Sequence, residues 1–271
     1  MVTVRISAFV QSFNQENKEE VQLVTIYDDE NFFNKYREMP RSQKGLAGAG
    51  EWQTLKKLLP DFTDKTVLDL GCGYGWHCQY AAQHGAEAVT GVDISEKMLA
   101  VAKDKTKGYP VNYLKADIAT VTFPPASFDI VISSLAIHYL ADFGSLIANI
   151  KSYLKPGGTL IFSVEHPAFT AEGTEDWYYD DNGDILHYPL DSYFLEGSRE
   201  TTFLGEKVMK YHRTLTTYLQ TLLKHRFTLL DVVEPMPPAS MLDEPGMKDE
   251  LRRPMMLIVK AQNQIDSMNI Q

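Results

Sequence analysis

The pattern of apolar and polar positions predicts buried strands that alternate with helices. Five apolar runs lie between residues 66 and 165, and they read TVLDL, EAVTGVD, VNYLKAD, FDIVISS and GTLIFSVE. Such runs, separated by helical stretches, are typical of a parallel sheet covered on both faces, because parallel neighbours need a crossover connection. A helical stretch YLQTLLKHR and two more runs, FTLLDVVE and MMLIVKA, bring the predicted total to seven strands.

Apolar residues at helical spacing also occur before the first predicted strand. Phe32, Phe33 and Tyr36 recur on one side of a predicted helix, Pro40 interrupts it, and EWQTLKKLL follows a glycine-rich link, GLAGAG. We therefore expect one α/β domain over residues 27–264, with a Rossmann-like, seven-stranded, mostly parallel sheet and helices on both faces. N-terminal helices and an insertion at about residues 166–206, after the fifth strand, complete it. We expect residues 1–26 to form a loosely ordered extension and residues 265–271 a tail.

Composition narrows the range of partners. Lys and Arg number 26 against 36 Asp and Glu, and this net charge of -10 disfavours nucleic acid, which is bound by basic surfaces. No signal peptide is recognised at the start, and no stretch approaches the roughly 18 apolar residues of a membrane span. The only two cysteines, Cys72 and Cys78, suggest no disulfide framework, fit a reducing cytoplasm and have no partners at metal-ligand spacing.

The densest candidate chemistry follows the first strand, in the sequence VLDLGCGYG. A turn alone would need one glycine, whereas Gly71, Gly73 and Gly75 together indicate close backbone approach to a ligand at the carboxyl end of the strand. The dinucleotide fingerprint would place the third glycine at position 76, which is Trp76. Nicotinamide binding is therefore disfavoured, although it stays open.

Two aspartates end the next two strands. Asp93 lies 22 positions after Gly71, where a carboxylate can accept hydrogen bonds from ribose hydroxyls. A helix N-cap is the alternative role, but Ser95 is better placed for it. Asp117 is placed to accept from an adenine amino group, and a solvated turn aspartate explains its position equally well.

These stretches resemble the class I S-adenosylmethionine-dependent methyltransferases. The resemblance rests on VLDLGCGYG, GVDISEKML, ADI, SFDIVISSLAIHYL and LKPGGTLIFSVEHP, and it covers roughly residues 27–261. The flanking stretches MPRSQKGLAGAGEW and KYHRTLTTY are similar to one bacterial subgroup of that family.

The resemblance implies S-adenosylmethionine as cofactor and a set of residues that hold it. Asp69 would lie near its ammonium group, Asp93 would bind the ribose, and Met98 would pack on the adenine, although core packing explains Met98 as well. The full implied set is Arg41, Asp69, Gly71, Cys72, Gly73, Asp93, Ile94, Met98, Asp117, Ile118 and Ser134.

Catalysis of methyl transfer depends mainly on positioning the acceptor against the cofactor, and it needs a base where the acceptor must lose a proton. His138 and His166, near strand ends, are the candidate bases, and a structural role is the alternative for each. The predicted insertion holds ten acidic residues, one arginine and many aromatic rings, so we expect it to cover a neutral or cationic small-molecule acceptor. Candidate acceptor contacts are Tyr139, Trp177, Tyr193 and Arg213. An oxidoreductase and a catalytically silent cofactor-binding module remain the alternatives.

Overall fold

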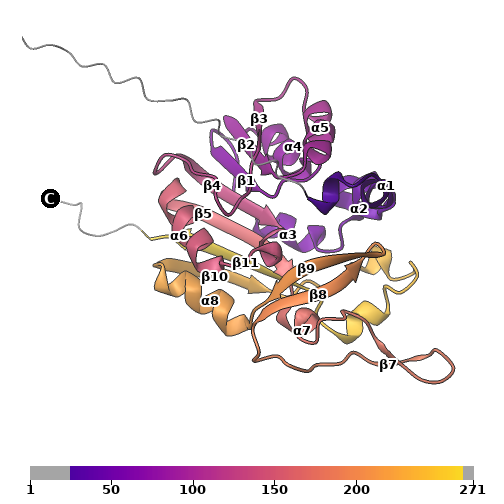
Figure 1. Cartoon of the computed structure of the whole chain (residues 1–271). Helices are drawn as coiled ribbons and strands as arrows, with labels where there is room; N and C mark the ends of the chain where they lie inside the picture. Colours follow the sequence, from indigo (N-terminus) through magenta and orange to yellow (C-terminus); the bar gives the residue numbers. More distant parts are fainter. Residues whose placement is uncertain (1–24, 265–271) are drawn as a thin grey trace, which may run out of the picture.

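The structure is a computed structural model that describes residues 25–264. The expectations for residues 1–24 and 265–271 lie outside the described residues. Strands and helices alternate in the order expected from the sequence, and Figure 1 shows helices on both faces of one central sheet.

Seven strands form the central sheet, in the spatial order β10-β11-β5-β4-β1-β2-β3. The first five in the chain are mutually parallel, and β11 is antiparallel to both of its neighbours. The predicted seven-stranded, mostly parallel sheet is therefore confirmed. The strands are β1 (Thr66–Leu70), β2 (Ala88–Asp93), β3 (Val111–Lys115), β4 (Phe128–Ser134), β5 (Leu154–Glu165), β10 (Phe227–Val233) and β11 (Met256–Asn263).

Alternation of side chains along the strands builds two hydrophobic layers. Leu68 and Phe162 pack with helices on one face, whereas Val67 and Ile161 pack with helices on the other. The first face is covered by α6 (Phe143–Tyr153) and α8 (Leu215–Lys224), and the second by α3 (Trp52–Leu58), α4 (Trp76–Gln83) and α5 (Glu96–Lys105).

Short elements surround the carboxyl ends of the parallel strands. Before the sheet lie η1 (Ile26–Asp28), α1 (Glu30–Glu38), α2 (Pro40–Gln43) and η2 (Gly45–Gly48), and η3 (Ile137–Tyr139) follows β4. The Phe32 ring of α1 packs edge-on against Phe203, 5.8 Å between centroids, so the early helices meet the insertion over this edge of the sheet.

The insertion contains more regular structure than the sequence indicated. It forms α7 (Pro167–Thr170) and two hairpins, β6 (Tyr178–Tyr179) with β7 (Ile185–His187), and β8 (Gly197–Phe203) with β9 (Glu206–His212). Leu204 and Gly205 join β8 to β9, both with positive φ (53° and 81°), as in the two-residue turns that match the twist of paired strands. Two short helices, η4 (Ala239–Met241) and η5 (Asp249–Arg252), precede β11.

Candidate functional site

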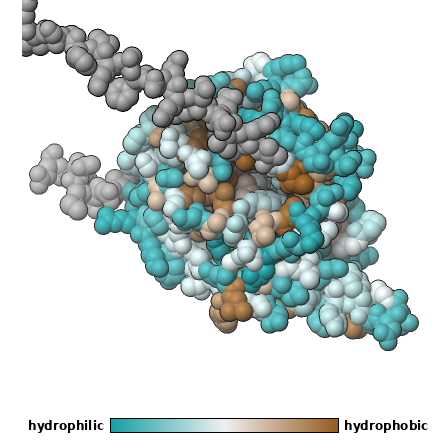
Figure 2. Space-filling view, viewed as in Figure 1, coloured by the Kyte–Doolittle hydropathy of each residue, from teal (hydrophilic) through white to brown (hydrophobic). Residues whose placement is uncertain are grey.

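Three neighbouring cavities lie where the parallel strands end. The first has a volume of about 410 Å³, the second about 70 Å³ and the third about 640 Å³. We call them the first cavity, the glycine-turn pocket and the large cavity. Figure 2 shows apolar side chains gathered around a hollow in the middle of this face. Ten residues predicted from the sequence line the first cavity: Arg41, Gly71, Gly73, Asp93, Ile94, Met98, Asp117, Ile118, Ser134 and Tyr139.

The three glycines after β1 serve different purposes. All have positive φ (76°, 51° and 70°), which favours glycine at each position. A Cβ atom on Gly71 would lie 2.3 Å from the Ala136 Cβ, and one on Gly75 would lie 2.3 Å from the Tyr113 hydroxyl, so these two permit close packing. No heavy atom lies within 4 Å of the Cβ position of Gly73. Of these three glycines, only Gly73 has open space where a side chain would begin, and it lines the first cavity and the glycine-turn pocket, as Gly71 also does.

Asp93 is fixed at the end of β2 by the backbone on both sides. Its Oδ2 accepts from the Gly73 N–H at 2.8 Å, and its Oδ1 accepts from the Ser95 N–H at 2.9 Å. Each carboxylate oxygen keeps a second lone pair for a ligand hydroxyl. Burial raises the pKa of this carboxyl. Ser95, not Asp93, caps α5 by accepting from the Met98 N–H, as the sequence indicated.

Asp117, Met98 and Ser134 make contacts within the protein and also line the first cavity. Asp117 Oδ1 accepts from the Ala119 N–H at 2.8 Å, so it is a turn aspartate that also lies in the wall. Met98 is 2% exposed and packs in α5 while it lines the cavity. The Ser134 hydroxyl lies 3.1 Å from that of Ser163. Both interpretations offered for Asp117 and Met98 are therefore compatible with their geometry.

The glycine-turn pocket contains polar groups that sequence reasoning missed. Four buried polar atoms in its wall have no hydrogen-bond partner among the described residues: Ser42 Oγ, Glu51 Oε2, Tyr74 Oη and Trp76 Nε1. Arg41 extends from α2 and pairs with the other oxygen of Glu51. Side chains that carry donors, an acceptor and a guanidinium therefore line a space of about 70 Å³, a composition suited to a ligand that carries both an ammonium and a carboxylate.

The structure does not bring Asp69 to the wall of any of these cavities. The side chain is 1% exposed, its Oδ2 accepts from the Cys78 thiol at 3.3 Å, and its Oδ1 has no partner among the described residues. Burial raises the pKa of this carboxyl to about 7. Cys72 does line the glycine-turn pocket, as a neutral thiol whose pKa burial raises to about 11.

The large cavity adjoins the first and shares its wall at Tyr27, Tyr36, Arg41, Leu135 and Tyr139. The Tyr27 and Tyr139 hydroxyls are hydrogen-bonded to each other at 3.1 Å, so an aromatic pair stands at this junction. Much of the remaining wall is made of flexible, polarizable methionine side chains, which adapt to apolar ligands: Met39, Met236, Met241, Met247, Met255 and Met256.

Neither histidine offers a free basic nitrogen to a cavity. The His138 ring lines the large cavity, but its Nδ1 accepts from the Glu165 N–H at 3.4 Å, which assigns the proton to Nε2. Burial lowers the pKa of His138 to about 3, so the ring is neutral and a weak base. His166 lines none of the three cavities. Its Nδ1 caps α7 by accepting from the Ala168 N–H, and its Nε2 lies 2.8 Å from Glu234.

Of the four candidate acceptor contacts, Tyr139 and Trp177 line the large cavity, whereas Tyr193 and Arg213 line none. Arg213 is 6% exposed, and its guanidinium donates to the carbonyl oxygens of Leu140 and Ala141. The Tyr193 hydroxyl accepts from the Leu215 N–H at 3.1 Å, at the start of α8. Both residues hold the insertion to the sheet domain.

Trp177 is held in place by arginines outside the insertion. Its ring lies 5.1 Å from the Arg252 guanidinium and 4.8 Å from that of Arg253, and its edge meets Tyr188 at 5.2 Å. Such cation–π contacts tie the Trp177 ring to the segment before β11. The β8–β9 hairpin, which we did not predict from the sequence, contributes Lys207, Val208 and Met209 to the first cavity.

Within residues 25–264, no helix is both long and apolar enough to cross a membrane. The same part of the chain contains no group of three or more His, Cys, Asp or Glu side chains placed to hold a metal ion.

Comparison with known proteins relates this geometry to a family. Residues 68–162 match a family described as a methyltransferase domain. A protein from Haemophilus influenzae whose function is uncharacterised is 36% identical over 251 residues, which make up 88% of this chain and 96% of that protein.

Two crystal structures share the fold at higher identity. A protein assigned as an S-adenosylmethionine-dependent methyltransferase from Listeria monocytogenes is 54% identical, with a TM-score of 0.78 over 82% of this chain and 100% of that one. An S-adenosylmethionine-dependent methyltransferase from Mesorhizobium loti is 41% identical, with a TM-score of 0.75 over 80% of this chain and 100% of that one.

Proposed function

Since this chain belongs to the class I S-adenosylmethionine-dependent methyltransferases, we propose that it methylates a small molecule held in the large cavity. The protein is an enzyme, and its cofactor is S-adenosylmethionine. Family membership favours the methyltransferase over the oxidoreductase and the silent module considered from the sequence.

The residues around the first cavity and the glycine-turn pocket fit this cofactor. Gly73 leaves space for a ligand against the backbone, and Asp93 keeps lone pairs for two ribose hydroxyls. The unpartnered atoms of Tyr74, Trp76 and Glu51 fit the ammonium and carboxylate of its amino-acid end. We assign that end to the glycine-turn pocket, and the adenine to the wall at Met98 and Ile118.

The protein's contribution to catalysis is chiefly positioning. When bound, S-adenosylmethionine supplies a methyl group already activated by a sulfonium. Asp93 and Gly73 orient the cofactor, the Tyr27–Tyr139 pair stands where the two cavities join, and the methionine wall excludes water from the acceptor. Neutral His138 holds the backbone of Glu165 through Nδ1 and acts here as a positioning residue.

The observation that carries the acceptor assignment is the large cavity itself. A volume of about 640 Å³ lies within the range of small-molecule pockets, and it adjoins the proposed cofactor site at five shared residues. The net charge of -10 argues against a nucleic acid acceptor, as the sequence suggested.

A cavity-filling substitution tests the assignment. Gly50 lines the large cavity, its φ is not in the left-handed region, and no heavy atom lies within 4 Å of its Cβ position. Gly50→Trp should fill the cavity and abolish transfer of radiolabelled methyl from S-adenosylmethionine to acceptors in a whole bacterial cell extract. Gly50→Ala is the matched control and should keep the transfer.

Two readouts make the result decisive. Wild-type label should pass an ultrafilter that retains macromolecules, and both Gly50 variants should bind S-adenosylhomocysteine within about twofold of wild type, because Gly50 lies outside the first cavity. Label retained with macromolecules, or undiminished transfer by Gly50→Trp, would overturn the small-molecule acceptor.

A further inference from the structure

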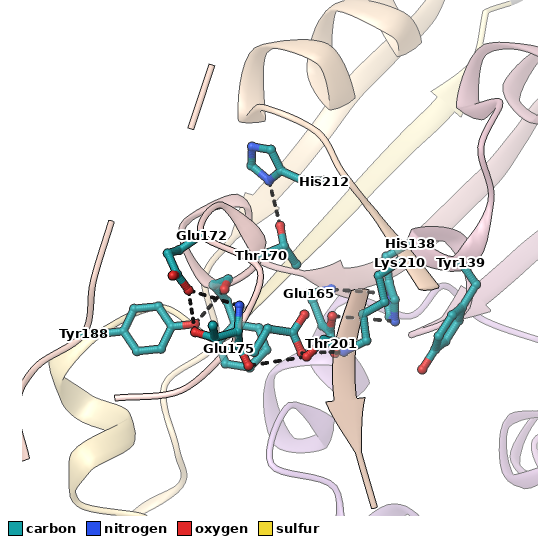
Figure 3. A network of polar contacts seen from close by, with 12 residues as sticks. His138, Tyr139, Glu165, Thr170, Glu172, Glu175, Tyr188, Thr201, Lys210 and His212 are labelled. Carbon is teal, nitrogen blue, oxygen red and sulfur yellow. Dashed lines mark hydrogen bonds and ion pairs between the residues drawn. The ribbon is translucent and has the colours of Figure 1, made fainter. Parts of the chain in front are cut away.

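One part of the large cavity's wall carries negative charge in excess. Glu165, at the end of β5, and Glu175, in the insertion, both pair with the Lys210 ammonium of β9, at 2.7 and 2.6 Å. The three side chains lie together in Figure 3, with His138 and Tyr139 beside them. Lys210 and Glu175 are only 2% and 8% exposed, so water screens these charges little. Two carboxylates therefore share one ammonium in a largely buried cluster.

The neighbouring charges do not correct this excess. His138 Nε2 lies 3.9 Å from Glu165 Oε2, but burial keeps the ring neutral by lowering its pKa to about 3. One oxygen of each carboxylate, Glu165 Oε2 and Glu175 Oε1, has no hydrogen-bond partner in the described chain. Burial, aided by the charge of Glu165, raises the pKa of Glu175 to about 7, so a proton offsets part of the excess near pH 7 and both carboxylates are fully charged only above about pH 8.

Each other carboxylate of the large cavity's wall among the described residues has a cation of its own, in the wall or beside it. Arg41 pairs with Glu51, Lys44 with Glu244, Arg252 with Asp249 and Arg253 with Glu250. Glu165 is thus the wall carboxylate that must share its cation.

The excess charge faces the space where an acceptor would bind. Glu165 lines the large cavity and is 16% exposed, whereas Lys210 and Glu175 lie behind it and line none of the three cavities. Tyr27, Tyr36 and Tyr139 border the same cavity, and the faces of such rings attract cations. An anionic acceptor would be repelled here, and a neutral hydroxyl would leave the charge uncompensated.

We propose that the acceptor carries a protonated amine that binds at Glu165, where it balances the two carboxylates that share Lys210. The inference rests on the proposed function, because it assumes that the acceptor occupies the large cavity. It narrows the substrate class to amines and makes Glu165 a specificity-determining residue.

The test compares three probes that share a benzene ring and differ in charge. They are 2-phenylethylamine, 2-phenylethanol and phenylacetate, titrated at about pH 8, where Glu175 is ionised, into protein saturated with S-adenosylhomocysteine. We expect the amine to bind about tenfold more tightly than the alcohol, and phenylacetate to bind least.

Two variants remove the excess charge and keep the buried lysine paired. In Glu165→Gln, Lys210 keeps Glu175, and in Glu175→Gln it keeps Glu165, so each leaves one carboxylate against one ammonium. Both should lower the amine's affinity about tenfold and change the alcohol's by less than about twofold. Glu38→Gln removes the same charge from an exposed position on α1, outside the three cavities, and should change neither.

Equal or absent binding of the three probes to the wild-type complex, or an amine preference that survives in both variants, would overturn the amine inference alone. Failure of the proposed function gives a different result, namely undiminished methyl transfer by Gly50→Trp.

Discussion

Replacement of Tyr74 by Phe should change stability and cofactor affinity in opposite directions. The side chain is 4% exposed, its hydroxyl has no hydrogen-bond partner among the described residues, and its ring packs edge-on against Phe33 and Tyr36. A buried polar group without a partner costs about 1–3 kcal/mol, and phenylalanine keeps the ring contacts. The free energy of unfolding of the ligand-free variant should therefore rise by about 1–2 kcal/mol.

The same change should weaken binding of S-adenosylhomocysteine. If the hydroxyl meets the amino-acid end of the cofactor, its loss removes a hydrogen bond worth about 1–2 kcal/mol, which corresponds to about five- to thirtyfold in Kd. Urea unfolding of the ligand-free protein gives the stability, and isothermal titration calorimetry gives the affinity.

Tyr153→Phe is the matched control. The Tyr153 hydroxyl is buried and donates to the Val121 carbonyl at 2.7 Å, and Tyr153 lines neither the first cavity nor the glycine-turn pocket. Its loss should lower stability by about 1 kcal/mol and leave the affinity for S-adenosylhomocysteine unchanged. Equal affinity of wild type and Tyr74→Phe would refute the assignment of the glycine-turn pocket to the amino-acid end.

Two further substitutions test the carboxylates near the cofactor. Asp93→Ala should weaken S-adenosylhomocysteine binding by about 1–3 kcal/mol, because the ribose loses its acceptor and Gly73 loses its anchor; unchanged calorimetric affinity in a folded variant contradicts the ribose role. Folding raises the pKa of Asp69 from its ordinary value of 3.8 to about 7, because the ionised carboxylate is buried. Its contribution to stability is therefore fully present below about pH 4 and is lost as the pH rises through about 7. In urea unfolding, wild type should lose roughly 4 kcal/mol relative to Asp69→Asn between about pH 4 and about pH 8, and parallel pH profiles would show that this carboxyl is not buried as described.

Local pattern predicted the sheet and many of the residues that line the first cavity, because both depend on short-range sequence. The apolar runs place Asp93, Asp117 and Ser134 at strand ends, and the ends of parallel strands meet at one edge. The open space beside Gly73 agrees with the close backbone approach predicted for this turn, because the residues that flank the glycine already fix the turn.

Side-chain partners distant in the sequence were not predictable in this way. The chain turns between α2 and α3, and this turn brings Glu51 to Arg41. Lys210 pairs with Glu165 because β9 folds back across the ends of the parallel strands. Asp69 was expected at the cofactor from its motif alone, whereas its contact with Cys78 one helix later keeps it inside the core. The β8–β9 hairpin was missed although LG between ETTF and EKVMKYH is a recognisable turn between alternating segments.

A crystal structure with S-adenosylhomocysteine is the most direct test of the account. We expect the ribose hydroxyls at Asp93, the amino-acid end in the glycine-turn pocket against Tyr74, and the sulfur at the junction marked by Tyr27 and Tyr139, directed toward the large cavity. A sulfur that faces away from the large cavity, or a cofactor whose amino-acid end lies outside the glycine-turn pocket, would contradict the account.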